Sequence, residues 1–492
     1  MAKITKVLIA NRGEIALRII RTLNNLGIAS VAVYHALDAD APYAEAAGEA
    51  VELVGDTPVG AYLQGERILD VARQTGADAI HPGYGFLSEN AAFAEAVEKA
   101  GLIFIGPRAK TIRLMGDKIT ARTFAAENGF PLAPSATLED DRTAFLKATE
   151  EIGFPLLIKA SAGGGGKGMQ IVEKAGELEA KVALAASEAE RAFGSSTLYA
   201  EKLVETPRHI EVQVLGDGKG EAIHLGEREC SIQRRFQKII EEAPAPALPD
   251  ETRNAIHETA VKIAKAAKYR GAGTVEFILG GDGEFYFLEM NTRLQVEHPV
   301  TEMITGVDLV AEQVSIAETG VLNHAQDDIT FEGHAIEARL YAEDADNGFL
   351  PVTGPLLVFE EPEGPGVRFD GGVREGTEVS AAFDPMLAKL IVYGADREAA
   401  LKRLVSALEG TVCLGVTTNI DFLARVAAHP AFAAGGYNTG FIAAHEGDLK
   451  PAPIGEDELD ILLTLAALSG KGPIDPPPAA PEPYASIGEW RN

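Results

Sequence analysis

The sequence predicts a multidomain chain that combines α/β and α+β folds, for three reasons. With 492 residues, the chain is too long for one hydrophobic core and corresponds to roughly two to four domains. Its N-terminal part alternates short apolar strands with amphipathic helices, a pattern typical of a doubly wound parallel sheet. Beyond residue 333, short strands predominate up to residue 392, which predicts a β-rich third domain.

The composition excludes several classes of protein. Hydrophobic residues make up 46% and charged residues 24% of the chain, as in ordinary soluble globular proteins. A formal net charge of -29 opposes binding to nucleic acid and to anionic membranes, so we expect neither as a partner. The two cysteines, Cys230 and Cys413, are far apart, and no secretory leader or membrane-spanning run is evident, so we expect a cytoplasmic location.

Two β-α-β rounds open the chain and predict the doubly wound sheet. Apolar patterning predicts strands at residues 6–10, 28–34, 79–80 and 102–105, and helices over residues 15–26, 61–75 and 91–100. No G-x-G-x-x-G motif follows a strand, so we predict no dinucleotide site.

A loop rich in glycine and aromatic residues lies at the end of the third strand. It reads H-P-G-Y-G-F-L-S-E-N over residues 81–90, at the carboxyl end of a parallel strand, where open α/β sheets bind ligands. Two interpretations stay open: a ligand-binding loop that contains Tyr84, or a tight turn in which Tyr84 only fills space.

Two further segments have features of phosphate sites. The tetrapeptide M-G-D-K at residues 115–118 opens a helix, and Lys118 is an ordinary surface lysine unless it faces a phosphate. The run K-A-S-A-G-G-G-G-K-G-M at residues 159–169 lies between two short strands. Its backbone N–H groups can surround phosphate oxygens between Lys159 and Lys167, although the residue order of a Walker A loop is missing. The alternative is a flexible linker.

The next segments are predicted strands with polar side chains. Residues 198–204 carry an acid and a base near their end, and such a strand can present backbone amides to a purine. Residues 208–215 alternate, so that His209, Glu211 and Gln213 share one face. For His209, a hydrogen bond to a ribose or a phosphate is more plausible than binding of a metal.

Residues 227–238 are dense in charge, although strands flank them. Repeated arginine and lysine in an acidic protein can mark a local anion site. Taken alone, this segment is better explained as a solvated face, because the acid pair Glu241 and Glu242 follows it.

A predicted hairpin places two acids side by side. Residues 273–277 and 285–288 are strand-like and are joined by the turn G-G-D-G. Glu276 and Glu289 then become neighbours, with the amide of Asn291 close by. Such an oxygen-rich site suits Mg²⁺ held together with phosphate oxygens.

The stretch that follows the hairpin has the residues of an oxyanion site. Arg293, Gln295 and Glu297 lie on the same side if this segment is extended. An arginine beside a carboxylate can hold a small oxyanion while the carboxylate removes its proton. The alternative, a solvated charged loop, is disfavoured because flexible turn formers are few and three phosphate-type segments precede it.

Five motifs together resemble the biotin carboxylase component of biotin-dependent carboxylases, within the ATP-grasp superfamily. They are H-P-G-Y-G-F-L-S-E-N, M-G-D-K, K-A-S-A-G-G-G-G-K-G-M, C-S-I-Q-R-R-F-Q-K and E-M-N-T-R-L-Q-V-E-H-P-V-T-E, and the resemblance covers about residues 3–447. It implies a Rossmann-like N-terminal domain at 1–114, an ATP-grasp domain with a glycine-rich lid at 115–331, a β-rich C-terminal domain at 332–447 and a Pro-rich linker or tail at 448–492.

The resemblance implies ATP-driven carboxylation of biotin by bicarbonate through carboxyphosphate. It implies that the nucleotide is held by Lys118, Lys159, Gly163, Gly164, Gly165, Gly166, Gly168, Met169, Glu201, Lys202, Leu203, Val204, His209 and Gln233. It implies that Mg²⁺ or Mn²⁺ is bound by Glu276, Glu289 and Asn291. Bicarbonate is assigned to Lys238, Arg293, Gln295 and Val296, with Glu297 as the general base. Biotin is assigned to Tyr84 and Arg339, where the arginine stabilises the enolate.

The resemblance also implies partners. No Met-Lys-Met-type biotinyl motif occurs within the sequence, so biotin is expected on a carrier domain, either in another polypeptide or in a region outside this sequence. A carboxyltransferase subunit and a homo-oligomer are expected as well. Residues 484–492 look like the segment that precedes further domains in acyl-CoA carboxylase α subunits, which favours an acetyl-, propionyl- or related acyl-CoA carboxylase.

Three alternative functions remain open, and one residue differs from the family pattern. A pyruvate carboxylase, a urea carboxylase or another ATP-grasp carboxylate ligase would share the phosphate and metal residues. Phe236 stands where relatives often carry histidine or another polar residue, so we expect no polar role for it.

Overall fold

The computed structural model describes residues 3–138, 142–160, 169–193, 197–453 and 455–469. The chain divides into a large unit that ends at Leu449 and a second unit that begins at Lys450. Residues 161–168, which include the glycines and Lys167 of the predicted phosphate loop, lie outside the described residues. The large unit contains all the other predicted site residues.

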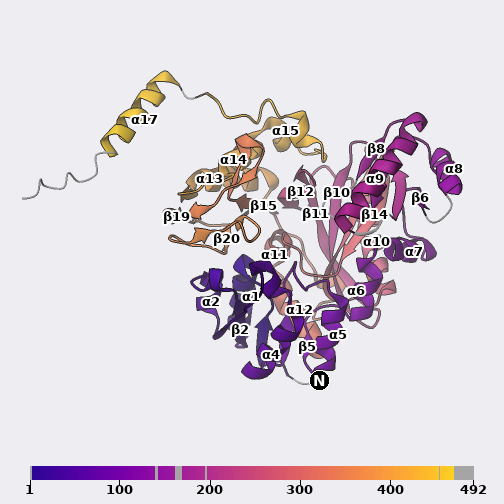
Figure 1. The fold of residues 1–492 in the computed structure, drawn as a ribbon, viewed down its shortest axis with the longest axis horizontal. Coiled ribbons are helices and arrows are strands. Elements are labelled where there is room, and N and C mark those ends of the chain that lie inside the picture. The colour runs from indigo at the N-terminus through magenta and orange to yellow at the C-terminus, as the bar shows by residue number, and fades with distance from the viewer. Residues whose placement is uncertain (1–2, 139–141, 161–168, 194–196, 454, 470–492) are drawn as a thin grey trace, which may run out of the picture. The chain divides into compact units, whose positions relative to one another are not determined.

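A parallel sheet with helices on both faces forms the N-terminal part of the large unit (Figure 1). Its strand order is β3-β2-β1-β4-β5, and all neighbouring strands pair in parallel, which confirms the predicted doubly wound sheet. Val7 and Ile9 of β1 pack with α1, whereas Leu8 packs with α4 and α5 on the other face. The strands are β1 (Lys6–Ile9), β2 (Ala29–Tyr34), β3 (Glu49–Glu52), β4 (Ala79–His81) and β5 (Ile103–Phe104). The helices are α1 (Gly13–Asn25), α2 (Pro42–Ala46), α3 (Pro58–Tyr62), α4 (Gly65–Thr75), α5 (Ala91–Lys99) and α6 (Ala109–Gly116).

Two predicted helices differ from the structure at their boundaries. The helix predicted over 61–75 is two helices, because α3 ends with Leu63 as its C-cap before α4 begins. The helix predicted to open with residues 115–118 begins only after Asp117, whose carboxylate accepts a hydrogen bond from the backbone N–H of Thr120 at 2.7 Å. That N-cap separates α6 from α7 (Lys118–Glu127).

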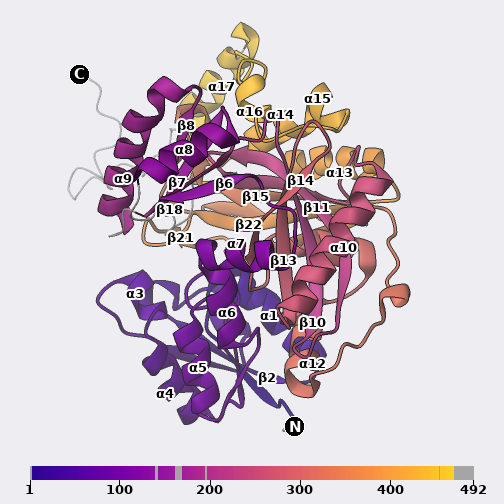
Figure 2. The ribbon, with the colours of Figure 1, turned by 90° about the vertical axis from the view of Figure 1, so that its right-hand side faces the viewer.

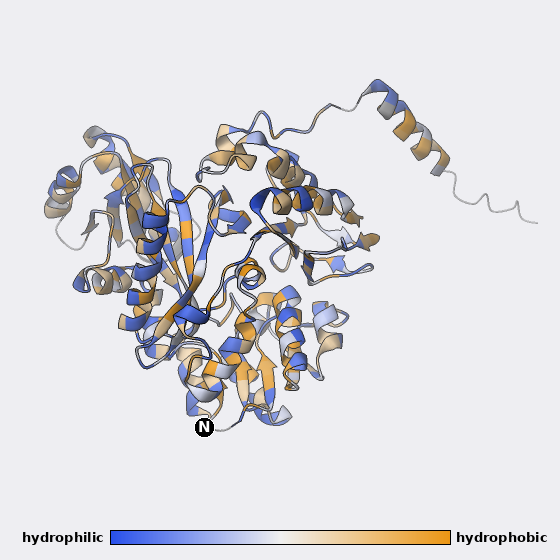
Figure 3. Ribbon diagram, turned by 180° about the vertical axis from the view of Figure 1, so that it is seen from behind, coloured by the Kyte–Doolittle hydropathy of each residue, from blue (hydrophilic) through white to orange (hydrophobic). Residues whose placement is uncertain are grey.

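Two large antiparallel sheets, with three two-stranded ones beside them, make up the described strands of the rest of the large unit (Figure 2). The smaller has the order β6-β9-β7-β8 and the larger β14-β13-β10-β11-β12-β15-β22-β20. In Figure 3 the N-terminal strands are mostly hydrophobic, whereas strands of the larger sheet alternate hydrophobic and hydrophilic residues. The strands are β6 (Ser135–Leu138), β7 (Leu156–Ala160), β8 (Gln170–Val172), β9 (Leu198–Lys202), β10 (Arg208–Asp217), β11 (Ala222–Arg234), β12 (Gln237–Ala243), β13 (Arg270–Leu279) and β14 (Phe285–Asn291). The helices are α8 (Arg142–Ile152), α9 (Leu178–Phe193), α10 (Asp250–Ala266), α11 (His298–Thr305) and α12 (Leu309–Thr319).

The predicted β-rich third domain is confirmed, and its main strands extend the larger sheet. β15, β22 and β20 follow β12 in the strand order, and α13 and α14 pack on them around Leu390 and Leu404. The strands are β15 (His334–Tyr341), β16 (Glu343–Asp344), β17 (Leu350–Pro351), β18 (Gly354–Pro355), β19 (Val358–Glu360), β20 (Val367–Gly371), β21 (Glu378–Val379), β22 (Met386–Gly394) and β23 (Val412–Leu414). The helices are α13 (Arg397–Gly410), α14 (Ile420–Ala428), α15 (Pro430–Ala433) and α16 (Phe441–Ala444).

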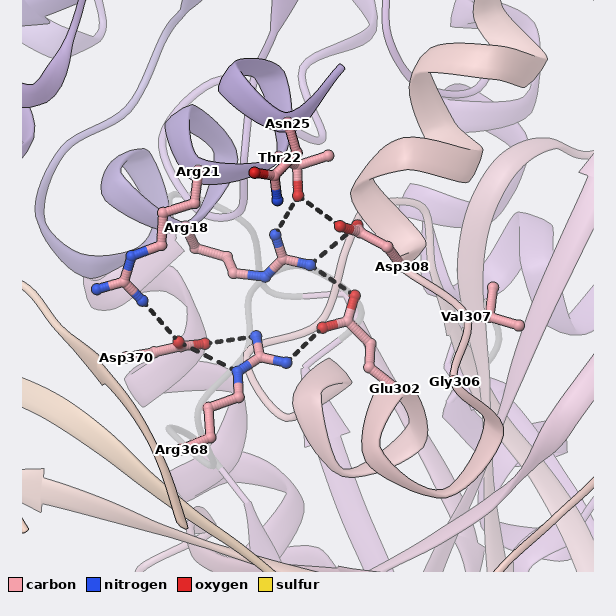
Figure 4. Close-up of a pocket in the computed structure, with 10 residues that line it drawn as sticks. All are labelled: Arg18, Arg21, Thr22, Asn25, Glu302, Gly306, Val307, Asp308, Arg368 and Asp370. Carbon is pink, nitrogen blue, oxygen red and sulfur yellow. Dashed lines mark hydrogen bonds and ion pairs between the residues drawn. The ribbon is translucent and has the colours of Figure 1, made fainter. Parts of the chain in front are cut away.

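Ion pairs connect the N-terminal helix α1 to the rest of the large unit (Figure 4). Arg18 contacts Glu302 of α11 at 2.7 Å, and Arg21 contacts Asp370 of β20 at 3.1 Å. Arg368 of β20 bridges the same two acids, at 2.8 Å to Glu302 and 2.7 Å to Asp370. These residues line a cavity of about 370 Å³. The three segments are therefore held together by charge as well as by apolar packing.

The segment 448–492, predicted as a Pro-rich linker or tail, contains a helix that the sequence analysis did not predict, α17 (Glu456–Ser469). A run of leucine and alanine without proline or glycine favours helix here, and the prolines begin only at residue 473. Residues 470–492 lie outside the described residues. No helix in the described part of the chain is long and apolar enough to cross a membrane.

Candidate functional site

The predicted hairpin of β13 and β14 is confirmed and brings two acids face to face. Glu276 pairs directly with Glu289, and Thr274 pairs with Asn291. The amide nitrogen of Asn291 donates to Glu276 at 2.7 Å. Burial and the charge of Glu276 raise the pKa of Glu289. A divalent cation would relieve this repulsion, and carboxylate and amide oxygens are the ligands that Mg²⁺ takes, so the residues fit the predicted cation.

Lys238 connects this acid pair to the predicted base. Its ammonium lies 2.6 Å from Glu211, 3.0 Å from Glu276 and 2.7 Å from Glu297. Burial opposes the charge of Lys238, yet the three carboxylates hold its pKa well above the ordinary value. Burial alone would raise the pKa of Glu276, but Lys238 and then His209 hold it below its usual range.

The interpretation of residues 227–238 as a solvated face is wrong. The segment forms most of β11, the turn and the start of β12, and Glu227, Arg228 and Glu229 are all buried. Every one of them has an ionic partner: Arg228, for example, donates to Glu211 at 2.5 Å. Buried charges persist when such partners satisfy them, and a count of charges along the sequence does not reveal the partners.

Residues 292–297 do not form a strand. The alternation of an extended strand, which was expected to place Arg293, Gln295 and Glu297 on the same side, is therefore absent from this segment. The chain instead turns into α11, with Glu297 as the N-cap residue. The three predicted side chains still converge, because Arg293 donates to Gln295 at 2.8 Å and Gln295 donates to Glu276 at 2.9 Å. Gln295 and Glu297 are buried, which excludes a solvated loop.

Arg339 lies on the other side of Glu297. It donates to Glu297 at 2.9 Å and to Glu241 at 2.6 Å. Burial opposes the ionised form of Glu297, but Lys238 and then Arg339 hold its pKa well below the usual range. Glu297 is therefore a buried, ionised carboxylate between two cations.

The loop at residues 81–90 contacts this centre, which favours the ligand-loop interpretation over a space-filling turn. Tyr84 donates a hydrogen bond to Glu14, and Glu14 pairs with Lys389 at 3.3 Å. Lys389 donates to the carbonyl of Val296 at 2.8 Å. From the same loop, Glu89 accepts a hydrogen bond from Arg293 at 3.1 Å.

The predicted nucleotide residues fall into two groups. Lys159 pairs with Glu201 between the adjacent strands β7 and β9, and the backbone N–H of Leu203 donates to Pro155. His209 belongs to the acid centre, since it contacts Glu276 at 2.8 Å. Lys202 at the end of β9, Val204 just after it and Met169 just before β8 belong to the group at the smaller sheet. Lys118 and Gln233 belong to the group at the acid centre. Lys118, at the start of α7, lies close enough to lower the pKa of Glu289, and Gln233 is hydrogen-bonded to His209 at 2.8 Å.

Phe236, for which no polar role is predicted, is placed in an exposed turn. It lies at the tip of the β11–β12 hairpin, is 65% exposed and has a left-handed backbone with φ 69°, next to Arg235 with φ 49°.

Sequence reasoning missed four buried members of the centre: Glu14, Arg228, Glu241 and Lys389. It also gave no role to Glu211 and Glu89, which bond to predicted site residues. The alternation of β10, with His209, Glu211 and Gln213 on one face, was the one available signal for Glu211.

The comparisons with known proteins define first the class and then the family. Residues 117–325 match the family described as carbamoyl-phosphate synthase L chain, ATP binding domain. With the antiparallel sheets and the acid-and-lysine centre, this match defines an ATP-grasp enzyme. Residues 3–112 match the biotin carboxylase N-terminal domain, and residues 337–444 match the biotin carboxylase C-terminal domain. The chain belongs to the biotin carboxylase family, which confirms the resemblance seen in the motifs.

Two kinds of curated relative are similar to the chain. It is 49% identical to the mitochondrial methylcrotonoyl-CoA carboxylase subunit alpha of Mus musculus over 91% of the chain, and spans 63% of that subunit's length. It is also 49% identical to the biotin carboxylase of Allochromatium vinosum, over 90% of the chain and 98% of that protein.

Solved structures with bound ligands share the fold. The biotin carboxylase domain dimer of Hydrogenobacter thermophilus 2-oxoglutarate carboxylase, in complex with MgADP, ADP and bicarbonate, is 45% identical with a TM-score of 0.88. It covers 92% of this chain and 100% of its own. A biotin carboxylase–β,γ-ATP complex from Campylobacter jejuni is 43% identical with a TM-score of 0.86 and covers 90% of this chain and 99% of its own.

Proposed function

We propose that this chain uses ATP and bicarbonate to carboxylate biotin carried by a partner protein or domain. The observation that carries the proposal is the position of Glu297, a buried carboxylate between Lys238 and Arg339 beside the facing pair Glu276 and Glu289. The site therefore combines a carboxylate that can act as a base, two cations that can bind an oxyanion, and a pair of carboxylates that can bind a metal ion. The relatives named biotin carboxylase, and the related structures with ADP and bicarbonate, support this assignment.

Bicarbonate would bind between Arg293, Gln295, the backbone of Val296 and Lys238. Glu297 is ionised at neutral pH and can accept the proton of bicarbonate. A bicarbonate anion that shares Lys238 would weaken the hold of this lysine on Glu297 and raise its proton affinity. The bicarbonate oxygen then attacks the γ-phosphorus, the bond to the ADP oxygen breaks, and carboxyphosphate and ADP form.

The nucleotide would lie between the smaller sheet and the acid centre. We assign it to Lys118, Lys159, residues 163–166, Gly168, Met169, Glu201, Lys202, Leu203, Val204, His209 and Gln233. Glu276, Glu289 and Asn291 would hold Mg²⁺ or Mn²⁺, which when bound neutralises charge on the phosphate oxygens.

Biotin would lie against Tyr84 and Arg339. In the second step the ureido nitrogen N1 loses its proton to the phosphate released from carboxyphosphate and forms a bond to the carboxyl carbon. The Arg339 guanidinium stabilises the negative charge on the ureido oxygen. Burial of this centre excludes water, to which carboxyphosphate would otherwise be lost.

The partners and the final acceptor belong to the same proposal. We propose a biotin carrier, a carboxyltransferase partner and a homo-oligomer; the carboxylase context of the relatives and the dimer in the related structure support them. The similarity to methylcrotonoyl-CoA carboxylase α subunits favours an acyl-CoA acceptor. A pyruvate-type or 2-oxoglutarate-type acceptor is the alternative, since those carboxylases also have similar structures.

We also keep the domain limits 1–114, 115–331 and 332–447 as proposals. The matched ranges 3–112, 117–325 and 337–444 support them. For the compartment we propose the cytoplasm, supported by two free cysteines, although relatives include mitochondrial subunits.

The testing experiment is ATP cleavage with Mg²⁺ and bicarbonate, with and without biotin. Stimulation by free biotin or by a biotinylated carrier domain, absent without bicarbonate, is the expected result. Cleavage that responds to neither form of biotin would contradict the proposal and would indicate an ATP-grasp ligase with another acceptor.

A further inference from the structure

A buried charged patch lies beneath the start of α11, on the face shared by β12, β15 and β22. In the strand register, Glu241 lies opposite Glu337, and Arg339 lies opposite Lys389. Opposite residues of an antiparallel pair point to the same face, so the four side chains are neighbours. All four are buried, and Glu241, Glu337 and Lys389 are fully inaccessible.

The two acids of this patch differ in how many of their carboxylate oxygens are hydrogen-bonded. Glu241 accepts a hydrogen bond from the Arg339 Nε at 2.6 Å, but its second oxygen has no partner among the described residues. Neither oxygen of Glu337 has a hydrogen-bond partner in the described part of the chain. Two ionised carboxylates side by side, with three unbonded oxygens, would cost several kcal/mol. One proton on the pair removes most of that cost, because only one of the two carboxylates then stays charged.

We propose that Glu241 and Glu337 share one proton and form a positioning pair that holds Arg339 in place while Glu297 changes its charge. The inference rests on the proposed function, in which Glu297 accepts the proton of bicarbonate. Once protonated, Glu297 attracts Arg339 less strongly. Glu241 binds the Nε of Arg339 and also contacts the Nη2 that reaches Glu297, and it carries the negative charge of the pair, so Arg339 stays where the biotin oxygen needs it.

The surrounding groups are consistent with one proton on the pair. Burial raises the pKa of Glu241 to about 7. Burial raises the pKa of Glu337 well above its ordinary value; Lys389 counteracts this, and the charge of Glu241 adds to it. The charged and titratable groups that act on the pair in the described part of the chain include Lys238 from β12, Cys230 from β11, Arg339 and Tyr341 from β15, Lys389 from β22, Glu297 at the start of α11, and Tyr84 from the loop at residues 81–90.

Infrared spectroscopy tests the shared proton without any activity assay. At about pH 8 an ordinary glutamate, with a pKa of about 4.3, is ionised. We expect the wild-type protein to show the carbonyl band of a protonated carboxylic acid that Glu337→Gln loses. Glu190→Gln, which removes an exposed carboxylate of α9, should keep it. An unchanged band in Glu337→Gln overturns the proposal. If that variant does not fold, Glu241→Gln should shift the band, and an unshifted band has the same meaning.

Kinetics test the positioning role. Glu241→Gln removes the constant counter-ion of Arg339, so we expect kcat of biotin-stimulated ATP cleavage to fall about 10- to 100-fold. The Kd of ATP should stay within about 3-fold, because no described contact of Glu241 or Glu337 involves a nucleotide residue. Full activity of Glu241→Gln overturns the positioning role. If the wild-type protein itself shows no stimulation by biotin, the proposed function fails, whereas the infrared result still decides the shared proton.

Discussion

The protonation state of Glu297 is set by the cations around it. Two cations reach this carboxylate from neighbouring strands, Lys238 from β12 and Arg339 from β15. Their combined attraction exceeds the effect of burial, which alone would favour a neutral acid. The residue is thus ionised before bicarbonate arrives, as a base must be, and each ligand that shares one of its cations changes its proton affinity.

Glu297→Gln tests the base. The amide keeps the size of the side chain but cannot accept the proton, so bicarbonate-dependent turnover should fall at least about 100-fold. ATP binding should remain, because none of the described contacts of Glu297 involves a nucleotide residue. Steady-state kinetics and calorimetric titration with ATP measure the two effects. An equal loss of ATP binding would contradict the assignment of Glu297 as the base.

Acid stability depends on another glutamate, Glu242. Burial would raise its pKa, but hydrogen bonds from His334 and Arg397 lower it to about 2. A depressed pKa contributes stability above the unfolded value of about 4.3, and that stability is lost as the pH falls toward 2. Urea unfolding of wild type and Glu242→Gln should therefore show a large difference at neutral pH that narrows between about pH 4.3 and 2. A difference independent of pH would argue against the ion pair as its cause.

The sequence could predict the residues of the centre that occur in distinctive runs. Glu276, Glu289, Arg293 and Glu297 follow one another in such a stretch, and the structure brings them together. Glu241 could not be predicted, because in sequence it is one acid among 73. Only the strand register, which places it beside Arg339, distinguishes it from a surface glutamate.

At the scale of elements, the predicted helices and strands exist but their ends depend on side-chain contacts. Apolar periodicity does not show where a helix stops, so the boundary between α6 and α7 was missed. The Asp117 cap that sets this boundary also places Lys118 at the first turn of α7. The N-terminus of a helix favours phosphate, and this lysine therefore lies where two positive contributions add.

Asp117→Ala should weaken both the helix and the nucleotide site. Loss of an N-cap costs about 1 kcal/mol of folding free energy, and fraying of the first turn would displace Lys118. We expect a several-fold increase in the KM for ATP, measured together with thermal unfolding. Asp117→Asn, which keeps a capping oxygen, is the control. If both variants bind ATP like wild type, the cap has no part in the site.

At the scale of the whole molecule, charge connects segments that lie far apart in sequence. Arg368 joins Glu302 of α11 to Asp370 of β20, and α1 reaches the same acids through Arg18 and Arg21 (Figure 4). The N-terminal sheet is thereby fixed to the larger sheet near the centre that contains Glu297.

Arg368→Met should destabilise the large unit. Removal of one partner leaves Glu302 and Asp370 with less compensation for burial, which costs about 3–5 kcal/mol for a fully buried pair and somewhat less here. Chemical unfolding measures the loss. Lys402→Met, which removes an exposed pair with Glu398, should leave the midpoint unchanged. Equal effects of the two substitutions would show that the network does not stabilise the fold.

The motifs could predict three domains. They could not predict that strands of the second and third domains belong to one sheet. Short strands after residue 333 indicated a separate β-rich domain, whereas β15, β22 and β20 continue the larger sheet. Strand pairing between distant segments depends on backbone hydrogen bonds that any sequence can form, so composition and periodicity contain little information about it.

This continuity affects how the substrates are held. Lys238 and Arg339 lie on adjacent strands of one sheet, whereas Lys159 and Glu201 belong to a sheet that shares no strand with it. His209, on β10, belongs to the larger sheet again. Lys238 and Arg339, assigned to bicarbonate and biotin, are thus anchored in one continuous frame, whereas the residues assigned to the nucleotide come from two.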